Sequence, residues 1–549
     1  MATRTGKPIR RLRPGPVLSW LVGVPLVLVV VAALGAAVLR GNPAWFVAMA
    51  ERLMPRRPVE AFANDKAGDV EHFKYGAIGN EAADGLPLKI WRVLPQVCPQ
   101  LLPVGAPRSY EAFGFTFERD GATGRLRETP IGLSRTRLGL APLDIEVLAI
   151  NCATCHVQTY ALPGDREPRI FVGGASNRLD AQGYTRFVAA CAETRGFDAD
   201  VLVAAMDARE QLSWPERLMY RHLVVPVARE LIRDRLGSRF HWTWSRPAWG
   251  PGRLSPFNPV KFDYLGQPVD STIDHGDVMP AWNVTRKEAM RSPTPWHWDG
   301  LSWDLKEVVL NSALGDGMTR FGYREETIER LLAYLRELRS PPSPMARDTV
   351  LEARGAALFA AECASCHAAG GKRIMSIIPR AEIGTDPNRI DMWTPQSAAA
   401  YNNYDRGSWR SSAPWYARAF DWTLDRLAGR PHGLPWEFTR FQKHEGYLAQ
   451  PLDGIWLTGP YLHNGSVPTL DDLLKPAAER PRAFVRGLDQ LDLVRGGYVS
   501  PPCEPERYVA AGGFCYDTTL AGNGNFGHEY GTRLSLEDRR ALVHYLLTL

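Results

Sequence analysis

The chain has 549 residues, of which 45% are hydrophobic and 23% are charged, an ordinary balance for a globular protein with two or three domains. The formal net charge is +5, and five of the positive charges stand before residue 14, so the rest of the chain is close to neutral. A nucleic-acid-binding protein needs a basic patch on its folded part, and we therefore do not expect nucleic acid as a partner.

The first 39 residues have the pattern of a membrane anchor. A basic tail, residues 1–16, precedes residues 17–39, which carry no charge and are long enough to cross a bilayer as one helix. Basic flanks stay cytoplasmic, so we expect a single-pass protein of the bacterial inner membrane with everything after residue 39 in the periplasm. The alternative is a cleaved secretory signal, because small residues at 32–37 could serve as a cleavage site.

Residues 40–300 predict a mixture of irregular, helical and loop-rich segments. Residues 40–140 show no clear strand pattern, and we interpret them as an irregular lead-in region. An apolar run at 140–150 delivers the sequence Asn151-Cys-Ala-Thr-Cys-His156. Residues 177–238 have the apolar spacing of helices, whereas residues 239–300 are crowded with Trp, Pro and Asp and predict a long loop-rich region.

Three further helices are predicted in the second half. Apolar spacing predicts a helix over 324–338, which ends at the proline-rich linker 339–344 because proline cannot continue a helix. A helix over 349–361 runs directly into a second Cys-x-x-Cys-His sequence, and an amphipathic helix over 535–549 begins with a serine N-cap. No strand-rich block is recognisable, so the predicted fold is mainly α with long loops.

The two Cys-x-x-Cys-His motifs are the only internal repeat. They consist of Cys152, Cys155 and His156, and of Cys363, Cys366 and His367. In this motif two thiols attach to the vinyl groups of haem as thioethers, and the histidine becomes the proximal ligand of the iron. We therefore predict two covalently bound haem c groups, one in an N-terminal haem c domain (141–345) and one in a C-terminal haem c domain (346–549).

Two other kinds of site use a similar cysteine spacing. A zinc site would need a second Cys/His pair nearby, and neither motif has one within about 30 residues. A thioredoxin-like redox site would need a βαβ context, which the sequence does not predict. Two copies in separate domains therefore favour haem.

Four cysteines remain outside the motifs: Cys98, Cys191, Cys503 and Cys515. In an oxidising compartment they allow three disulfide connectivities. We favour a bond between Cys503 and Cys515, because both lie in one loop rich in Gly and Pro. Cys98 and Cys191 could equally be free buried thiols.

The sequence narrows the choice of distal ligand for the C-terminal iron. No methionine follows Met392, so a distal methionine could come only from Met375 or Met392. The later histidines are His432, His444, His463, His528 and His544. His528 lies in a glycine-rich loop at 522–531 that can approach a flat macrocycle closely, and we predict it as the distal ligand. We expect His463, which precedes a turn, to form hydrogen bonds near the haem edge.

Several segments resemble a known family. The sequences Trp282-Asn283, Trp298-Asp299-Gly300 and Asp304-Leu-Lys-Glu307 resemble the region after the first haem of bacterial di-haem cytochrome c peroxidases. Residues 454–470 resemble the C-terminal haem domain of those enzymes. Gly-His-Glu-Tyr-Gly at 527–531 is similar to the branch of that superfamily that contains the haem-dependent rubber oxygenases. The resemblance covers residues 140–549 and leaves the first 140 unexplained.

The resemblance implies a division of labour between the haems. The haem on His156 would be the reactive one, and the haem on His367 would be six-coordinate and pass electrons. Trp298 matches the tryptophan between the two haems and would be an electron relay, with a core aromatic as its alternative role. Val308 stands where the peroxidases have a glutamine near the peroxide site. This departure argues against an ordinary peroxidase and is compatible with an apolar pocket for O2.

These residues predict a di-haem c-type cytochrome with electron-transfer activity. The first hypothesis is a peroxidase- or oxygenase-like oxidoreductase that uses peroxide or O2, with His156 and Trp298 as catalytic residues. The second is a membrane-tethered periplasmic electron carrier without catalysis. The expected partners are a redox partner protein or a quinol-linked donor, together with a small-molecule oxidant under the first hypothesis.

Overall fold

The structure is a computed structural model of the whole chain. It describes residues 54–63, 65–139, 144–238, 240–402, 426, 436–504 and 513–549. Residues Met54–Leu549 form one compact unit. The predicted basic tail (1–16) and membrane helix (17–39) lie outside the described residues, and the predicted domain boundary at residue 345 stays a prediction.

The prediction of a mainly α fold with a transmembrane helix is wrong on two points. First, the described chain contains a four-stranded sheet of order β1-β3-β4-β2 together with several two-stranded sheets. Second, within the described ranges no helix combines the length and apolarity that crossing a bilayer requires. The predicted single-pass position in the bacterial inner membrane is therefore not retained.

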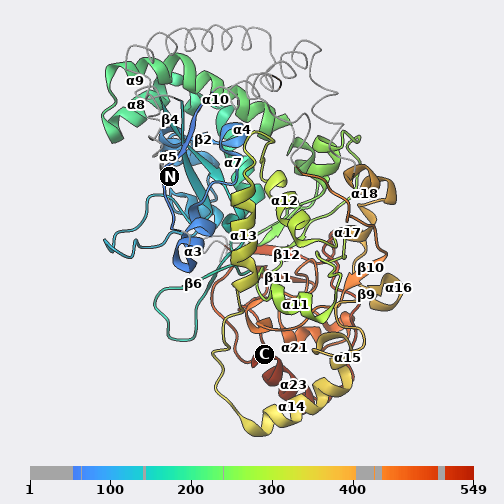
Figure 1. Cartoon of the computed structure of the whole chain (residues 1–549). Coiled ribbons are helices and arrows are strands. Elements are labelled where there is room, and N and C mark those ends of the chain that lie inside the picture. The colour runs from blue at the N-terminus through green and yellow to red at the C-terminus, as the bar shows by residue number, and fades with distance from the viewer. Residues whose placement is uncertain are drawn as a thin grey trace, which may run out of the picture. The chain divides into compact units, whose positions relative to one another are not determined.

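The helices largely agree with the apolar spacing of the sequence (Figure 1). Those of the first half are α3 (Lys66–Tyr75), α4 (Glu81–Asp84), α5 (Leu88–Val97), α6 (Cys152–Cys155), α7 (Ala181–Ala192), α8 (Ala199–Glu210), α9 (Trp214–Met219) and α10 (Val225–Ile232). Those of the second half are α11 (Val284–Met290), α12 (Leu305–Gly315), α13 (Glu325–Glu337), α14 (Thr349–Glu362), α15 (Ala364–His367), α16 (Arg380–Ile383), α17 (Asn388–Asp391), α18 (Pro395–Asn402), α21 (Leu470–Leu473) and α23 (Leu536–Leu547). The helices predicted at 324–338, 349–361 and 535–549 are confirmed by α13, α14 and α23.

The strands are short. They are β1 (Arg56–Pro58), β2 (Leu86–Pro87), β3 (Leu133–Leu138), β4 (Ile145–Ile150), β5 (Val157–Tyr160), β6 (Arg169–Val172), β7 (Arg253–Leu254), β8 (Gly276–Asp277), β9 (Ile377–Pro379), β10 (Gly446–Leu448), β11 (Ala483–Arg486) and β12 (Phe514–Asp517). The named pairs among them are all antiparallel.

The four-stranded sheet is built mainly from the region predicted to be an irregular lead-in. β3 pairs with β4 in a register that runs from Leu133 opposite Ile150 to Leu138 opposite Ile145. The sequence pattern does not predict β3, because Ser134 and Thr136 are both buried and the buried side chains of this strand are therefore not all apolar. Since β4, an inner strand of the sheet, ends at Ile150, the first Cys-x-x-Cys-His motif follows directly at the end of this strand.

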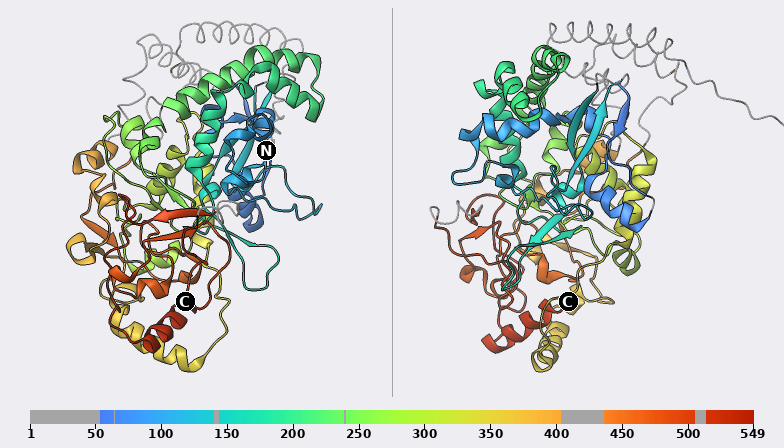
Figure 2. Two further views of the ribbon diagram at one scale, coloured as in Figure 1. Left: turned by 180° about the vertical axis from the view of Figure 1, so that it is seen from behind. Right: turned by 90° about the vertical axis from the view of Figure 1, so that its left-hand side faces the viewer.

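Three apolar clusters form the interior. The sheet core joins α5, α7, α8 and α10 to the sheet and includes Leu133, Leu148, Phe187 and Leu202. The central core surrounds α12 and α13 and includes Leu310 and Leu331. The C-terminal core surrounds α23 and includes Trp456, Leu457 and Leu542. Figure 2 shows the helices of the sheet core stacked beside the strands.

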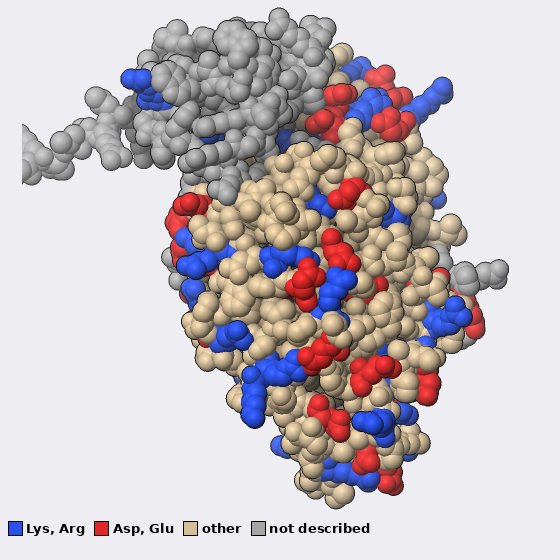
Figure 3. All heavy atoms as spheres, turned by 90° about the vertical axis from the view of Figure 1, so that its right-hand side faces the viewer, with Lys and Arg blue, Asp and Glu red and all other residues tan. Residues whose placement is uncertain are grey.

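Charged side chains of both signs are interspersed on the surface shown in Figure 3. Many pair locally, as Arg354 of α14 does with Glu537 (3.1 Å) and Asp538 (2.8 Å) of α23. Exposed pairs of this kind contribute about 0–1 kcal/mol each. The association of α14 with α23 therefore depends on packing rather than on these charges.

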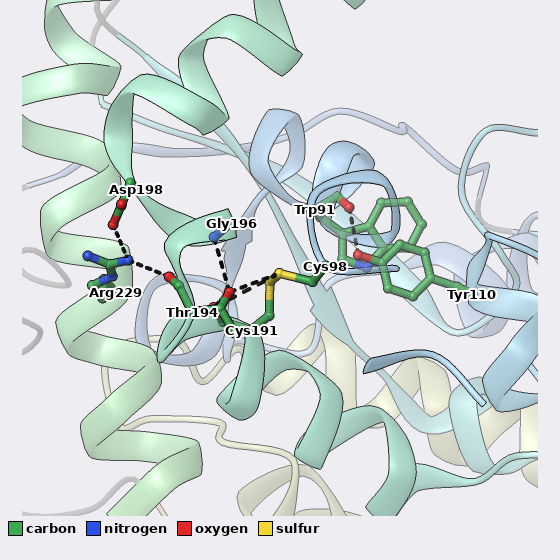
Figure 4. Close-up of a disulfide and its surroundings, with 8 residues drawn as sticks. All are labelled: Trp91, Cys98, Tyr110, Cys191, Thr194, Gly196, Asp198 and Arg229. Atoms are coloured by element: carbon green, nitrogen blue, oxygen red, sulfur yellow. Dashed lines mark hydrogen bonds and ion pairs between the residues drawn. A yellow bond between two sulfur atoms is a disulfide. The ribbon is translucent and has the colours of Figure 1, made fainter. Parts of the chain in front are cut away.

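Two disulfide bonds join the four cysteines that lie outside the motifs. Cys503 bonds to Cys515 beside β12, as predicted, and Cys98 bonds to Cys191. The second bond joins the end of α5 to α7, with both cysteines fully buried in the sheet core (Figure 4). Such bonds are typical of proteins in oxidising compartments. The motif cysteines stay free in the same structure.

Gly355 sets the distance between α14 and α23. A Cβ atom at this position would lie 2.5 Å from the Cβ of Tyr545 and still closer to the carbonyl oxygen of Ala541. Glycine inside a helix costs roughly 0.5–1 kcal/mol relative to alanine, so a glycine here indicates that the close approach is needed.

Gly355→Ala should therefore lower the free energy of unfolding by about 1–3 kcal/mol, because the backbone of α23 cannot yield as a flexible side chain can. Chemical denaturation followed by circular dichroism measures the change. Gly315→Ala, at the end of α12 with open space around the added methyl group, is the matched control and should be neutral or stabilising. Equal stability of the two variants would show that the helices have room to move apart.

Candidate functional site

The first motif is held at the end of β4 by Asn151. Its side-chain oxygen accepts a hydrogen bond from the Ala153 amide (3.0 Å) and caps α6, while its Nδ2 donates to the carbonyl of Gly76 (3.0 Å). His156 follows α6 directly, and its Nδ1 lies 3.2 Å from the carbonyl oxygen of Gly174. A histidine that donates one ring nitrogen to a backbone carbonyl keeps the other nitrogen free for a metal.

The two thiols of this motif do not resemble those of a redox disulfide. Burial raises the pKa of Cys152 to about 12 and holds the pKa of Cys155 well above its usual value. Redox-active Cys-x-x-Cys thiols have lowered pKa values instead. Burial also lowers the pKa of His156 to about 4, so its imidazole is neutral, as a metal ligand must be.

The thiols of the first motif pack against apolar clusters, and the buried carboxylate of Asp316 lies close enough to act on both of them. Cys152 packs against the central core and Cys155 against the sheet core. Val308, which takes the place of the peroxidase glutamine, also packs against the central core. Within the part of the chain that the structure describes, no group of three or more His, Cys, Asp or Glu residues is arranged to hold a metal ion.

The second motif follows α14. Cys363 ends that helix, α15 carries Cys366 and His367, and Nδ1 of His367 lies 2.6 Å from the carbonyl oxygen of Gln450. This arrangement repeats the one at His156. Burial lowers the pKa of His367 and favours the neutral ring. Both histidines thus have one nitrogen engaged by a carbonyl, which suits a proximal iron ligand.

His528 faces His367. The centroids of the two imidazole rings are 6.2 Å apart. Two metal–nitrogen bonds of about 2 Å, together with the half-widths of two rings, add up to roughly this separation. Burial lowers the pKa of His528 to about 3, and the proximity of His367 contributes to this shift. The structure thus brings together the two histidines that the sequence suggested as ligands of the C-terminal iron, and the pair fits a haem held between them.

The backbone explains how His528 reaches this position. Its φ of 50° is left-handed, and its amide donates to the carbonyl of Ile383 (2.7 Å). The preceding Gly527 packs so closely on Gly384 that a Cβ atom there would lie only 2.2 Å from the carbonyl carbon of Gly384 and 2.3 Å from the amide nitrogen of Thr385. The glycine before His528 therefore allows the loop to come very close to another segment, and that segment is the backbone of Gly384 and Thr385.

Arg480 fixes the loop that carries His528. Its Nη1 donates to the carbonyls of Asn525 (2.6 Å) and Gly527 (2.8 Å), and its Nη2 donates to that of His528 (3.4 Å). The residue is almost completely buried. Because this buried cation donates hydrogen bonds to the loop carbonyls, Arg480 acts as a positioning residue for His528. No signal in the sequence pointed to this role, because Arg480 lies 48 residues away from His528 along the chain.

Two further residues singled out from the sequence are Trp298, which lies between the two motifs along the chain, and His463, which follows the second motif. Nε1 of Trp298 donates to the carbonyl of Asp277 (2.8 Å), and the carbonyl of Trp298 accepts from the Leu448 amide (2.7 Å). His463 stacks on Tyr447 with ring centroids 4.0 Å apart, and its Nε2 lies 3.0 Å from the hydroxyl oxygen of Tyr447. The predicted place of His463 near a haem edge stays a prediction. The relay role of Trp298 stays a prediction.

Asp299 and His297 flank Trp298. Asp299 lies 3.7 Å from Arg389, and the two form a buried ion pair. His297 has a φ of 67°, and burial lowers its pKa to about 4. Its Nε2 is buried without a hydrogen-bond partner among the described residues. His297 was not among the predicted site residues, although its position next to Trp298 could have drawn attention to it.

The motifs, the buried neutral histidines and the apolar surroundings define the class of a c-type cytochrome. Comparison with known proteins agrees, because residues 446–485 match a family model described as RoxA-like, cytochrome c-like. This segment contains residues 454–470, on which the resemblance to a C-terminal haem domain rests. The match links the chain to RoxA-like cytochromes and supports covalent haem c and electron transfer. It does not extend to the di-haem peroxidases specifically.

Two proteins of Sinorhizobium fredii (strain NBRC 101917 / NGR234) are similar to parts of the chain. The uncharacterized protein y4iJ is 32% identical over 37% of this chain and 39% of its own length. The uncharacterized protein y4iM is 37% identical over 30% of this chain and 37% of its own length. The chain thus covers about two fifths of the length of each of these relatives.

Proposed function

We propose that the chain is a di-haem c-type cytochrome that reduces a small oxidant, peroxide or O2, with electrons passed through its C-terminal haem. Cys152, Cys155 and His156 would hold one haem. Cys363, Cys366 and His367 would hold the other, with His528 as its sixth ligand. When bound, haem supplies one-electron transfer and, at an open iron position, activation of peroxide or O2.

One difference between the two motifs carries this proposal. At the second motif an imidazole faces the proximal histidine, which suits a closed, electron-transferring site. At the first motif no second histidine ring lies at a comparable distance from His156 among the described residues. A haem on His156 without a facing imidazole would keep one iron position for a small oxidant, which suits a reactive site.

The residues of the chain would then have separate tasks. Gly174 and Gln450 orient the proximal rings through their carbonyls. The central core excludes water beside Cys152. Trp298, tied to Asp277, would serve as the relay that the resemblance to di-haem peroxidases and rubber oxygenases implies. The electrons would come from a redox partner protein or a quinol-linked donor.

Haem stoichiometry and ligand binding test the proposal together. A pyridine haemochrome assay should give two covalent haems per chain, and CO should shift the spectrum of one of them after reduction. The other haem should remain low-spin and unaffected, because His367 and His528 occupy both faces of its iron. Two low-spin haems that ignore CO would identify an electron carrier, and a single haem would contradict the assignment of two sites.

A further inference from the structure

Tyr75 is a buried tyrosine beside the first motif. It is the last residue of α3, which packs against α6, the short helix of that motif. The backbone carbonyls on either side of it, those of Lys74 and Gly76, accept hydrogen bonds of 3.3 and 3.0 Å from Nδ2 of Asn151, which directly precedes the motif. The side chain of Tyr75 is 2% exposed and belongs to the central core, as Ala153 of the motif does. A phenol is thus held close to the first haem site.

The hydroxyl of Tyr75 donates a hydrogen bond to Oε1 of Glu118 (2.9 Å). The side chain of Glu118 is 17% exposed, so this carboxylate joins the buried phenol to the surface. The ordinary pKa of a phenol, about 10, is far above that of a carboxylic acid, about 4. Burial raises the pKa of Tyr75 further, and the negative charge of Glu118 adds to this shift. Tyr75 therefore keeps its proton, and the proton can move to Glu118 only when removal of an electron has made the phenol strongly acidic.

Glu118 belongs to a network of five charged side chains. Lys74 lies 2.9 Å from Glu71 and 3.0 Å from Glu118. Arg127 lies 3.0 Å from Glu71 and 3.9 Å from Glu118. It also lies 3.4 Å from Asp120. Three carboxylates thus accompany two cations, and this excess of negative charge favours the uptake of a proton.

A cation covers the ring of Tyr75. The guanidinium carbon of Arg127 lies 4.5 Å from the ring centroid. Because a cation is attracted to the electrons of an aromatic ring, it makes the loss of an electron from that ring less favourable. Tyr75 should therefore yield an electron only to a strong oxidant, and peroxide, an oxidant of the proposed function, is one.

Peroxide reduction creates a need for such a donor. Hydrogen peroxide takes up two electrons and two protons when it is reduced to two water molecules, whereas a haem passes electrons one at a time. Until the C-terminal haem has passed two electrons in succession, a one-electron donor beside the first haem site is needed to complete the reduction. The position of Tyr75 beside the first motif suits this task.

We propose that Tyr75 is a redox-active tyrosine that gives one electron to the first haem site during peroxide reduction and passes its hydroxyl proton to Glu118. The O–H bond of Tyr75 breaks, a bond between the proton and Oε1 of Glu118 forms, and a neutral tyrosyl radical remains. One electron from the C-terminal haem, together with the proton on Glu118, then restores the phenol. The inference rests on the proposed function.

Freeze-quench electron paramagnetic resonance of the oxidised holoprotein, mixed with hydrogen peroxide, tests the proposal. Wild-type protein should give an organic radical signal that becomes narrower when the tyrosines carry deuterated rings. Tyr75→Phe should abolish the signal, and Glu118→Gln should reduce it severalfold because an amide cannot take up the proton. Tyr334→Phe is the control and should leave the signal unchanged. Tyr334 is a buried tyrosine of the same core, and its hydroxyl has no carboxylate partner in the described part of the chain.

Haem content, CO binding and peroxide consumption of the same samples separate the possible failures. A radical that survives in Tyr75→Phe would overturn the role of Tyr75 and leave the proposed function intact, and so would peroxide consumption by wild-type protein without any radical. Wild-type protein that neither binds CO nor consumes peroxide would overturn both. If Tyr75→Phe does not fold or loses haem, Glu118→Gln decides. A severalfold weaker tyrosyl signal in that variant supports the proposal, and an undiminished one contradicts it.

Discussion

His528→Ala should convert the low-spin signal of the C-terminal haem into that of a high-spin, CO-binding species and leave the signal of the other haem unchanged. The physical reason is the facing pair of imidazoles, 6.2 Å apart, in which His528 is the only ring opposite His367 among the described residues. Without it the C-terminal iron would lose its sixth ligand while its thioethers and His367 stay in place. Absorption and electron paramagnetic resonance spectra measure the change.

His544→Ala is the matched control for this experiment. His544 lies in α23, within the C-terminal part of the chain, and its replacement should leave both spectra as they are. Histidine–methionine ligation raises a haem potential relative to bis-histidine ligation, so His528→Met should give a low-spin haem of higher potential. A high-spin signal that arises from His463→Ala and not from His528→Ala would mean that the turn after Tyr461 covers the iron instead.

Cys363→Ala combined with Cys366→Ala should reduce the covalent haem content from two equivalents to about one. The thioethers of the second motif could no longer form, whereas Cys152 and Cys155 pack against other cores than Cys363 does and keep their haem. The protein should also become less stable, because a cofactor that binds only the native state contributes its binding energy to folding. Haemochrome assay and thermal unfolding measure the two effects.

The control for this double variant also removes two cysteines from the C-terminal part of the chain. Cys503→Ala with Cys515→Ala breaks the disulfide beside β12, which should cost about 2–4 kcal/mol but leave both haems attached. A loss of both haems in the Cys363/Cys366 variant would indicate that the two sites cannot be filled independently. Retention of both would show that the second motif is not an attachment site.

Features that depend on local pattern were the best predicted from the sequence. The helices α13, α14 and α23 follow apolar spacing, and Ser535 caps α23 by accepting from the Asp538 amide (3.1 Å). The Cys503–Cys515 bond closes a short loop. Elimination among the few later methionines and histidines led to His528, whose ring lies 6.2 Å from that of His367; its role as a ligand stays a prediction.

What could not be predicted depends on contacts between distant segments. β3 has buried Ser134 and Thr136 where an apolar alternation would have revealed a strand. Cys98 and Cys191 lie 93 residues apart, and spacing alone does not indicate their bond. Arg486 looks in the sequence like any surface arginine. Only the folded chain shows that it is buried.

The arrangement of the second site has a consequence for the order of events during synthesis. His367 and its cysteines leave the ribosome early, while His528 and α23 follow roughly 160 residues later, about 8–30 s at ordinary translation rates. During this interval Gly355 has no helix to pack against and His367 has no facing ring. Under the proposed function, haem attachment at Cys363 and Cys366 can therefore precede the folding of α23 and of the loop that carries His528.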